Sequence, residues 1–129
     1  IIFIAVGGGG SPVFVQEDNT LEGIDAVIDK DLTSAVLGQS IGAEFMAILM
    51  GEPQVAINFG QPNQRNLGKI SRDEAVELLE RGEFAEGSMA PKVRAAIKFL
   101  DGGGRKVIIT NTDNLYDAFH DEAGTRITS

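Results

Sequence analysis

The chain is organised around the stretch Gly87-Ser88-Met89-Ala90-Pro91-Lys92, which opens an amphipathic run over residues 93–100. Pro91 is typical of the first turn of a helix, where its missing N–H costs no hydrogen bond, and Ser88 is placed to cap that helix. Lys92 is unusual there, because a helix N-terminus already carries partial positive charge. An anion bound by free backbone N–H groups and Lys92 would remove the repulsion, so the stretch predicts a phosphate site. On this stretch alone, a solvated surface lysine is the simpler interpretation.

Composition and charge restrict the class of protein. The chain has 129 residues, enough for one domain over residues 1–129, and no apolar run approaches the ~20 residues of a membrane span. Its formal net charge is −8 and its eleven Lys and Arg residues are scattered, which argues against a nucleic-acid partner. The absence of cysteine fits a cytoplasmic location, and with His120 as the single histidine no protein metal site is predicted. Because the chain begins on an apolar run without methionine, we expect a fragment or a processed half.

The apolar run at residues 1–6 leads directly into four glycines at residues 7–10. The run is typical of a strand covered on both faces in a parallel sheet. Four glycines lose much entropy on ordering, so a ligand-facing loop that includes Gly8, Gly9 and Gly10 is favoured over a flexible linker. The loop lacks the Gly-Lys-Ser/Thr of a Walker A motif, and no helix follows it as in a dinucleotide-binding fingerprint.

A second lysine stands at another expected helix start. Residues 24–28 are extended and apolar enough to approach the core, and they deliver Asp29-Lys30-Asp31. Helical spacing of apolar residues then predicts a helix over residues 32–41, with Asp31 as its N-cap. Lys30 is either part of a surface salt-bridge cluster of small energetic value, or a lysine that neighbouring carboxylates aim at phosphate oxygens. The sequence does not separate these two alternatives.

The rest of the chain alternates strands and helices. The capping box from Ser71 to Glu74 predicts a helix that ends at Gly82, and residues 114–119 predict a short one. Strand, helix and strand with short connections is typical of a βαβ unit, so we predict an α/β fold with a mostly parallel sheet. A short extended segment is expected at residues 12–16, followed by an acidic turn (17–20) and a connection (21–23). Further along the chain we expect a buried strand at 45–50, a short strand at 55–59, a strand at 106–110 and an edge strand at 124–127.

With these pieces in order, the chain resembles the C-terminal half of the carbamate kinases, within the amino-acid kinase superfamily. The resemblance runs from Val6 to Thr125. It implies a three-layer αβα sandwich, reversible phosphoryl transfer between ATP–Mg²⁺ and carbamate, and usually a homodimer. It rests on the order and spacing of five segments: Gly7-Gly8-Gly9-Gly10-x-Pro12-Val13, Ala26-Val27-Ile28-Asp29-Lys30-Asp31, Ile57-Asn58-Phe59-Gly60, Gly82-x-Phe84-x-x-Gly87-Ser88-Met89-x-Pro91-Lys92 and Gly124-Thr125.

The same resemblance implies roles for the candidate residues. Lys30 and Lys92 would stabilise charge on the nucleotide phosphates and on the transferred phosphoryl group, and Asp31 would orient the two lysines. The glycine loop would lie near the acceptor and the transferring group. Positioning and electrostatics dominate phosphoryl transfer, so the lack of a covalent nucleophile is expected. The residues expected at the nucleotide are Gly8, Gly9, Gly10, Met50, Gly51, Ser88, Met89 and Pro91, with Met50 and Gly51 near the base.

Two departures from the family pattern leave the function open. Family members usually read Leu-Thr-x-Val where this chain reads Leu49-Met50-Gly51-Glu52-Pro53. The resemblance also implies that the N-terminal half, with most carbamate contacts and the usual dimer surface, is missing. We therefore expect exposed apolar surface, and a homo-oligomer or association with the missing half.

Three functions follow from these observations. The first is the nucleotide-binding lobe of a carbamate kinase, which makes ATP from carbamoyl phosphate and ADP in arginine metabolism. The alternative is a non-catalytic nucleotide-binding or interaction module. The third is a kinase for another acceptor, such as an acylated amino acid. The motif Asp29-Lys30-Asp31 favours the carbamate branch over this one.

Overall fold

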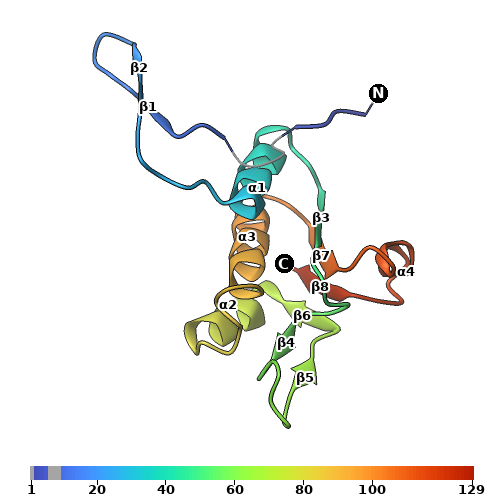
Figure 1. Cartoon of the computed structure of the whole chain (residues 1–129). Coiled ribbons are helices and arrows are strands. Elements are labelled where there is room, and N and C mark those ends of the chain that lie inside the picture. Colours follow the sequence, from blue (N-terminus) through green and yellow to red (C-terminus); the bar gives the residue numbers. More distant parts are fainter. Residues whose placement is uncertain (1, 6–9) are drawn as a thin grey trace.

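A four-stranded sheet with helices on both faces is the centre of the fold (Figure 1). The computed structural model describes residues 2–5 and 10–129. Its elements in chain order are β1 (Val13–Val15), β2 (Leu21–Gly23), α1 (Lys30–Ser40), β3 (Phe45–Leu49), β4 (Ala56–Ile57), β5 (Arg65–Asn66), β6 (Lys69–Ser71), α2 (Arg72–Glu80), α3 (Ala90–Asp101), β7 (Lys106–Thr110), α4 (Leu115–Phe119) and β8 (Thr125–Thr128).

The strand order in the central sheet is β3-β7-β8-β6. The pairs β3 with β7 and β6 with β8 are parallel, whereas β7 and β8 are antiparallel, which confirms the predicted α/β fold with a mostly parallel sheet. The prediction of an edge strand at residues 124–127 is wrong, because β8 pairs on both sides. Thr125 and Ile127 are fully buried, as expected for an interior strand that is covered by neighbours.

Helices lie on opposite faces of the sheet, in agreement with the predicted αβα layers (Figure 1). Successive side chains of a strand point to opposite faces. On β3, Met46 and Ile48 are buried in the core beneath α3, whereas Phe45 stacks on Phe119 of α4 with ring centroids 5.9 Å apart. Helices α1, α2 and α3 therefore cover one face, and α4 covers the other.

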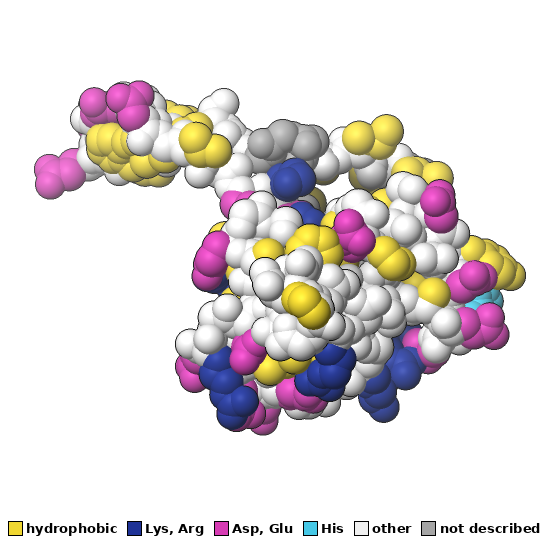
Figure 2. Space-filling model, turned by 60° about the horizontal axis from the view of Figure 1, so that its bottom comes forward, with side chains coloured by type: hydrophobic (Ala, Val, Ile, Leu, Met, Phe, Trp, Pro, Cys, Tyr) yellow, Lys and Arg dark blue, Asp and Glu magenta, His cyan; other side chains and the backbone are white. Residues whose placement is uncertain are grey.

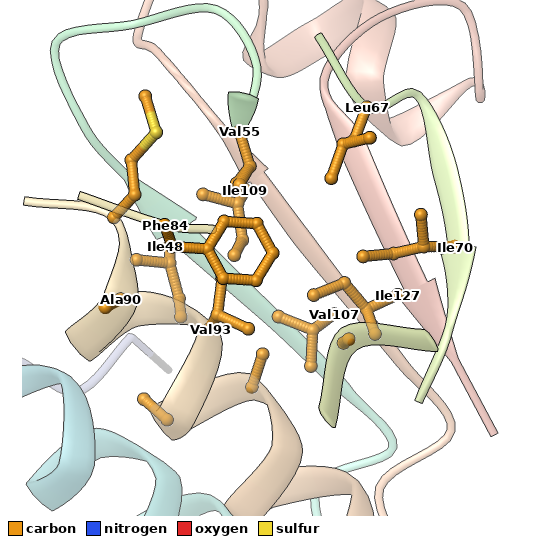
Figure 3. Close-up of a cluster of buried hydrophobic side chains, with 14 of the residues drawn as sticks. Ile48, Val55, Leu67, Ile70, Phe84, Ala90, Val93, Val107, Ile109 and Ile127 are labelled. Carbon is orange, nitrogen blue, oxygen red and sulfur yellow. The ribbon is translucent and has the colours of Figure 1, made fainter. Parts of the chain in front are cut away.

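Helix α3 supplies the largest share of the core. Val93 of this helix lies among Ile48 of β3, Val107 and Ile109 of β7 and Phe84 (Figure 3). Each fully buried side chain of this size stabilises the fold by about 1.5–3 kcal/mol relative to an exposed one. The buried residues of α3 are Ala90, Val93, Ala95, Ala96, Phe99 and Leu100.

The sequence predicted the first residue of α2 correctly, but not those of α1 and α3. Ser71 is confirmed as the N-cap of α2, because the Glu74 N–H donates to Ser71 Oγ (3.0 Å), and Gly82 follows the helix with φ +70°. The prediction of Asp31 as N-cap is wrong: Asp29 Oδ1 accepts the Leu32 N–H (2.8 Å), and α1 begins two residues earlier than residue 32.

The predicted N-cap of α3 is also wrong. Met89 occupies that position, and no side chain caps the helix. The preceding turn explains this, because the N–H groups of Ser88, Met89 and Ala90 all donate to the Ala85 carbonyl oxygen, at 3.2, 2.9 and 3.1 Å. Ser88 lies within this turn rather than at the helix boundary.

Two predicted apolar segments of the N-terminal part are not buried. Residues 2–5 form no strand, and Ile2 and Ile4 are 94% and 97% exposed. Residues 24–28 are irregular, with Val27 99% exposed. A buried strand needs neighbours on its edges and faces, and the described residues of the central sheet place only β7 beside β3. The predicted βαβ unit therefore lacks its first strand, which was expected at residues 24–28; residues 1 and 6–9 lie outside the described residues.

The predicted extended segment at residues 12–16 is part of a hairpin that the sequence did not reveal. Strand β2, predicted as a connection, pairs antiparallel with β1, and the acidic turn joins them. Strands β5 and β6 were likewise missed, because they are short and lack an apolar run. Within the part of the chain that the structure describes, no helix combines the length and apolar character needed to cross a membrane.

Candidate functional site

A pocket of about 440 Å³ lies between the start of α1, the end of β3 and the start of α3. Such a position, outside the carboxyl ends of sheet strands, is where open α/β folds bind ligands. The pocket brings together Lys30, Asp31, Met50, Gly51, Ser88, Met89, Pro91 and Lys92, all of which the sequence singled out, with Asp29, Leu49, Glu52, Phe59 and Gly87.

Two lysines meet at one carboxylate in this pocket. Lys92 Nζ donates to Asp31 Oδ2 at 2.9 Å, and Lys30 Nζ lies 4.0 Å from the same oxygen. The side chains of Lys92 and Asp31 are only 13% and 11% exposed, whereas that of Lys30 is 61% exposed. Lys92 is thus held by a carboxylate that comes from another helix, while Lys30 lies mostly in solvent.

The helical positions of these residues explain the geometry. Because Asp29 takes the N-cap position of α1, Asp31 lies in the first helical turn and its carboxylate is available to Lys92. Lys92 lies in the first turn of α3, which packs beside α1. The carboxylate of Asp31 therefore offsets the repulsion between Lys92 and the helix N-terminus, a role that the sequence predicted for a bound anion.

The backbone contributes less to an anion site than the sequence predicted. The N–H groups of Ser88, Met89 and Ala90 are directed at the Ala85 oxygen, Pro91 has none, and the Lys92 N–H donates to the Met89 oxygen. The expected cradle of free N–H groups is consequently not formed at this end of α3. Positive charge in the pocket comes from the two ammonium groups.

The lining is mixed in charge, with two lysines and three carboxylates, of Asp29, Asp31 and Glu52. Among the residues that the structure describes, no group of three or more His, Asp or Glu side chains is arranged to hold a metal ion. A bare polyphosphate would therefore meet a lining with a net negative charge, and a cation that arrives with the phosphates would balance it.

A sequence model of the amino acid kinase family matches residues 6–111. The chain belongs to the amino acid kinase family. It is 48% identical over 124 residues to a carbamate kinase of Thermoplasma acidophilum, and 46% identical over 127 residues to carbamate kinase 2 of Staphylococcus aureus strain bovine RF122. These matches cover 96% and 98% of this chain but 40% of each relative, so the chain spans about 40% of the length of the curated relatives it matches.

Solved structures agree with this assignment. A carbamate kinase from Giardia lamblia bound to AMP-PNP superposes with a TM-score of 0.88 at 39% identity, covering 95% of this chain and 42% of that one. An N-acetylglutamate synthase from Neisseria gonorrhoeae superposes with a TM-score of 0.62 at 20% identity over 91% of this chain and 26% of that one, which shows a shared fold only. The predicted resemblance to carbamate kinases is confirmed.

Some pocket residues of this amino acid kinase chain were not predicted as site residues. Phe59 lines the pocket and follows Asn58, which has φ +51°; it belongs to the segment Ile57-Asn58-Phe59-Gly60 of the resemblance, but no role was predicted for it. Asp29 already belongs to the predicted Asp29-Lys30-Asp31 group, whereas the only local signal for Glu52 is its position next to Gly51. Gly10 is described but is not part of the pocket lining, and Gly8 and Gly9 lie outside the described residues.

Proposed function

We propose that this chain is the nucleotide-binding lobe of a carbamate kinase-like phosphotransferase, which transfers a phosphoryl group reversibly between ATP–Mg²⁺ and carbamate. The observation that carries the proposal is the pair of lysines at one carboxylate, with Lys92 Nζ 2.9 Å from Asp31 Oδ2 at the pocket wall. The similarity to carbamate kinases over nearly the whole chain supports it. We place the reaction in the cytoplasm, in arginine catabolism, where carbamoyl phosphate and ADP would yield ATP.

The two lysines have different tasks in this proposal. Phosphoryl transfer requires positioned positive charge, because negative charge is spread over the phosphoryl oxygens in the transition state. Lys92 is poorly hydrated and already fixed by Asp31, so little reorganisation is needed when phosphate oxygens arrive. Lys30 is exposed and can swing from its 4.0 Å distance to Asp31 towards the phosphates. Asp31 positions the lysines and does not react.

The remaining lining fits a nucleotide in size and chemistry. A pocket of about 440 Å³ is within the range that holds a small ligand. Leu49, Met50 and Phe59 offer apolar surface to the base, and Gly51, Ser88, Pro91 and the buried Met89 complete the wall. The Giardia relative was solved with AMP-PNP, which is a nucleotide of this class. Gly8, Gly9 and Gly10 are proposed to lie near the acceptor.

The carboxylates of the lining fit a magnesium ion that binds together with the nucleotide. Mg²⁺ is usually held by one or two carboxylates, phosphate oxygens and water rather than by a complete protein cage. Glu52 is the carboxylate best suited to this, because Asp29 caps α1 and Asp31 binds Lys92. When bound, Mg²⁺ would neutralise charge on the phosphate oxygens.

Calorimetric titration of the chain with ADP–Mg²⁺ tests the nucleotide site directly. We expect saturable binding, and a loss of at least about tenfold in affinity for Lys92→Ala, because a charge-assisted contact to phosphate is removed. Lys98→Ala is the matched control, since Lys98 lies on the same helix but not in this pocket, and it should bind like the unaltered chain. Absence of binding at millimolar ADP–Mg²⁺, or equal affinity for all three proteins, would contradict the proposal.

A second function is possible for a chain that matches only part of its relatives' length. Because the chain covers 40% of its relatives, a non-catalytic nucleotide-binding or interaction module is the second candidate. ATP formation from carbamoyl phosphate and ADP separates the two, when it is measured on the chain alone and on the chain completed with the predicted N-terminal half. ATP formed only by the completed protein supports the kinase lobe. Nucleotide binding without ATP formation in either protein supports the module.

A further inference from the structure

Thr110 is a buried polar residue that lies directly behind the pocket. It is the last residue of β7, its side chain is 0% exposed, and it does not line the pocket. Its carbonyl oxygen accepts the Met50 N–H at 2.8 Å, and its hydroxyl donates to the Pro53 carbonyl oxygen at 3.1 Å. One residue therefore binds both ends of the segment from Met50 to Pro53.

The segment held by Thr110 forms one wall of the pocket. Met50, Gly51 and Glu52 line the same pocket as the lysines of α1 and α3. This segment contains no helix or strand, so its shape depends on contacts with its surroundings. Gln54 fixes the far side of the turn, because its Nε2 donates to the Gly124 oxygen at 2.9 Å.

Gly124 makes room for this arrangement. It has φ +76°, and a Cβ atom at this position would lie 3.1 Å from Thr110 Cβ and 3.3 Å from the Ile109 oxygen. The close approach of the two backbones leaves the Thr110 hydroxyl in a defined place beneath Pro53. The anchor is thus formed where β7 ends and where the chain enters β8, the two interior strands of the sheet.

We infer that Thr110 is a positioning residue of the nucleotide pocket, which sets the conformation of Met50, Gly51 and Glu52 without touching the ligand. The inference rests on the proposed nucleotide site. Removal of the hydroxyl leaves the Pro53 oxygen without its donor, and an unpaired acceptor at a part-buried site favours movement towards water. The wall would then move relative to Lys30 and Lys92, and the nucleotide would lose contact with one side of its pocket.

Thr110→Val tests the inference, because valine keeps the shape and removes only the hydroxyl. Thr125→Val is the matched control: Thr125 is also 0% exposed, and its hydroxyl accepts the Val55 N–H at 2.8 Å and donates to the Leu67 oxygen, yet neither partner lines the pocket. Thr110→Ser keeps the hydroxyl and should restore the anchor. Two readouts are needed: the hydrogen exchange of the amides of residues 50–52 and 54, since Pro53 has no N–H, and the Kd for ADP–Mg²⁺.

We expect Thr110→Val to speed exchange at residues 50–52 and 54 and to weaken ADP–Mg²⁺ binding by about fivefold to tenfold, the equivalent of one hydrogen bond. Thr110→Ser should recover most of both effects, and Thr125→Val should leave the Kd within about twofold despite a comparable loss of stability. If the unaltered chain binds ADP–Mg²⁺ and Thr110→Val binds equally tightly, the inference fails and the proposed function stands. If the two valine variants weaken binding equally, the effect is general destabilisation and the inference also fails. If the unaltered chain binds no nucleotide, both fail.

Discussion

Phe99 shows how single glycines control the distance between the two helices that carry the lysines. Its ring is 1% exposed and lies between Gly38 of α1 and Gly104 after α3. A Cβ atom would lie 2.8 Å from the ring at position 38 and 2.2 Å at position 104. Both distances are shorter than real side chains permit. Gly38 therefore lets α1 approach the Phe99 ring of α3, and Gly104 lets the chain after α3 pass close to the same ring.

Gly104→Ala is expected to destabilise the chain by about 2–3 kcal/mol, because the ring of Phe99 must leave its position in a packed core. Gly38→Ala should also lose stability, although alanine in a helix ordinarily gains up to about 1 kcal/mol over glycine. Urea unfolding measures both changes. Gly68→Ala is the control, since its Cβ would meet only Gln54 Nε2 at 3.7 Å, and it should be nearly neutral. A Gly104→Ala variant as stable as the unaltered chain would disprove this account of the packing.

At the scale of elements, the layer formed by α4 is attached to the sheet by polar and aromatic contacts at its edge. Lys106 of β7 lies 4.4 Å from the ring centroid of Phe45, which stacks on Phe119. Asp121, in the turn after α4, accepts hydrogen bonds from Lys106 Nζ (3.2 Å) and forms an ion pair with Arg126 of β8. Arg126 and Lys106 hold the pKa of the Asp121 carboxyl below its ordinary value.

Asp121→Asn should therefore lower the Tm by a few degrees at pH 7, with a difference that depends on pH. Asparagine tolerates the φ of +66° at this position, so the backbone is kept. Because the folded-state pKa of Asp121 is lowered, its contribution to stability is fully present above the ordinary value of 3.8 and is lost as the pH falls through the lower folded-state pKa. Thermal unfolding from pH 7 to pH 2 measures the difference, which should shrink below pH 3.8 and then vanish. Glu122→Gln removes the same charge one residue away and should show a smaller effect; a difference that is constant with pH would contradict the ion-pair explanation.

For the whole molecule, the notable feature is the amount of apolar surface that is exposed. Within the described residues, β3 pairs only with β7, so its other edge is open. The hairpin of β1 and β2 projects from the body and carries hydrophobic and acidic side chains (Figure 2). On one face of this hairpin Val13, Val15 and Leu21 are 48%, 63% and 68% exposed. A two-stranded hairpin is only marginally stable in water, so a covering surface would stabilise it.

We expect the chain to self-associate, because the open edge of β3 and these apolar side chains can pair with a second copy. Light scattering coupled to size exclusion at several concentrations measures the mass in solution. Ala47→Lys places a charge on the exposed face of β3 and should raise the monomer fraction, since lysine on an edge strand opposes edge pairing. A monodisperse monomer of the unaltered chain at the highest concentration would refute the expectation.

The sequence by itself determined the elements whose signals are local. Ser71 and Gly82 mark the limits of α2, and the apolar run at residues 106–110 forms β7, because caps and β-branched runs act within one turn or one strand. It also pointed to Lys30, Asp31 and Lys92 as a group, through the order of short segments that resemble the carbamate kinases.

The tertiary structure decided what depends on partners distant in the chain. Asp29 rather than Asp31 caps α1, and Asp31 pairs with Lys92, which lies 61 residues later in the chain, a contact that no local pattern predicts. The polar strand β6 forms because interior strand β8 lies beside it, whereas the strongly apolar residues 2–5 form no strand because none of the described residues pairs with them. A strand pair or an ion pair needs two partners. The residues of one segment show that it could form such a pair, but not whether the partner lies beside it in the fold.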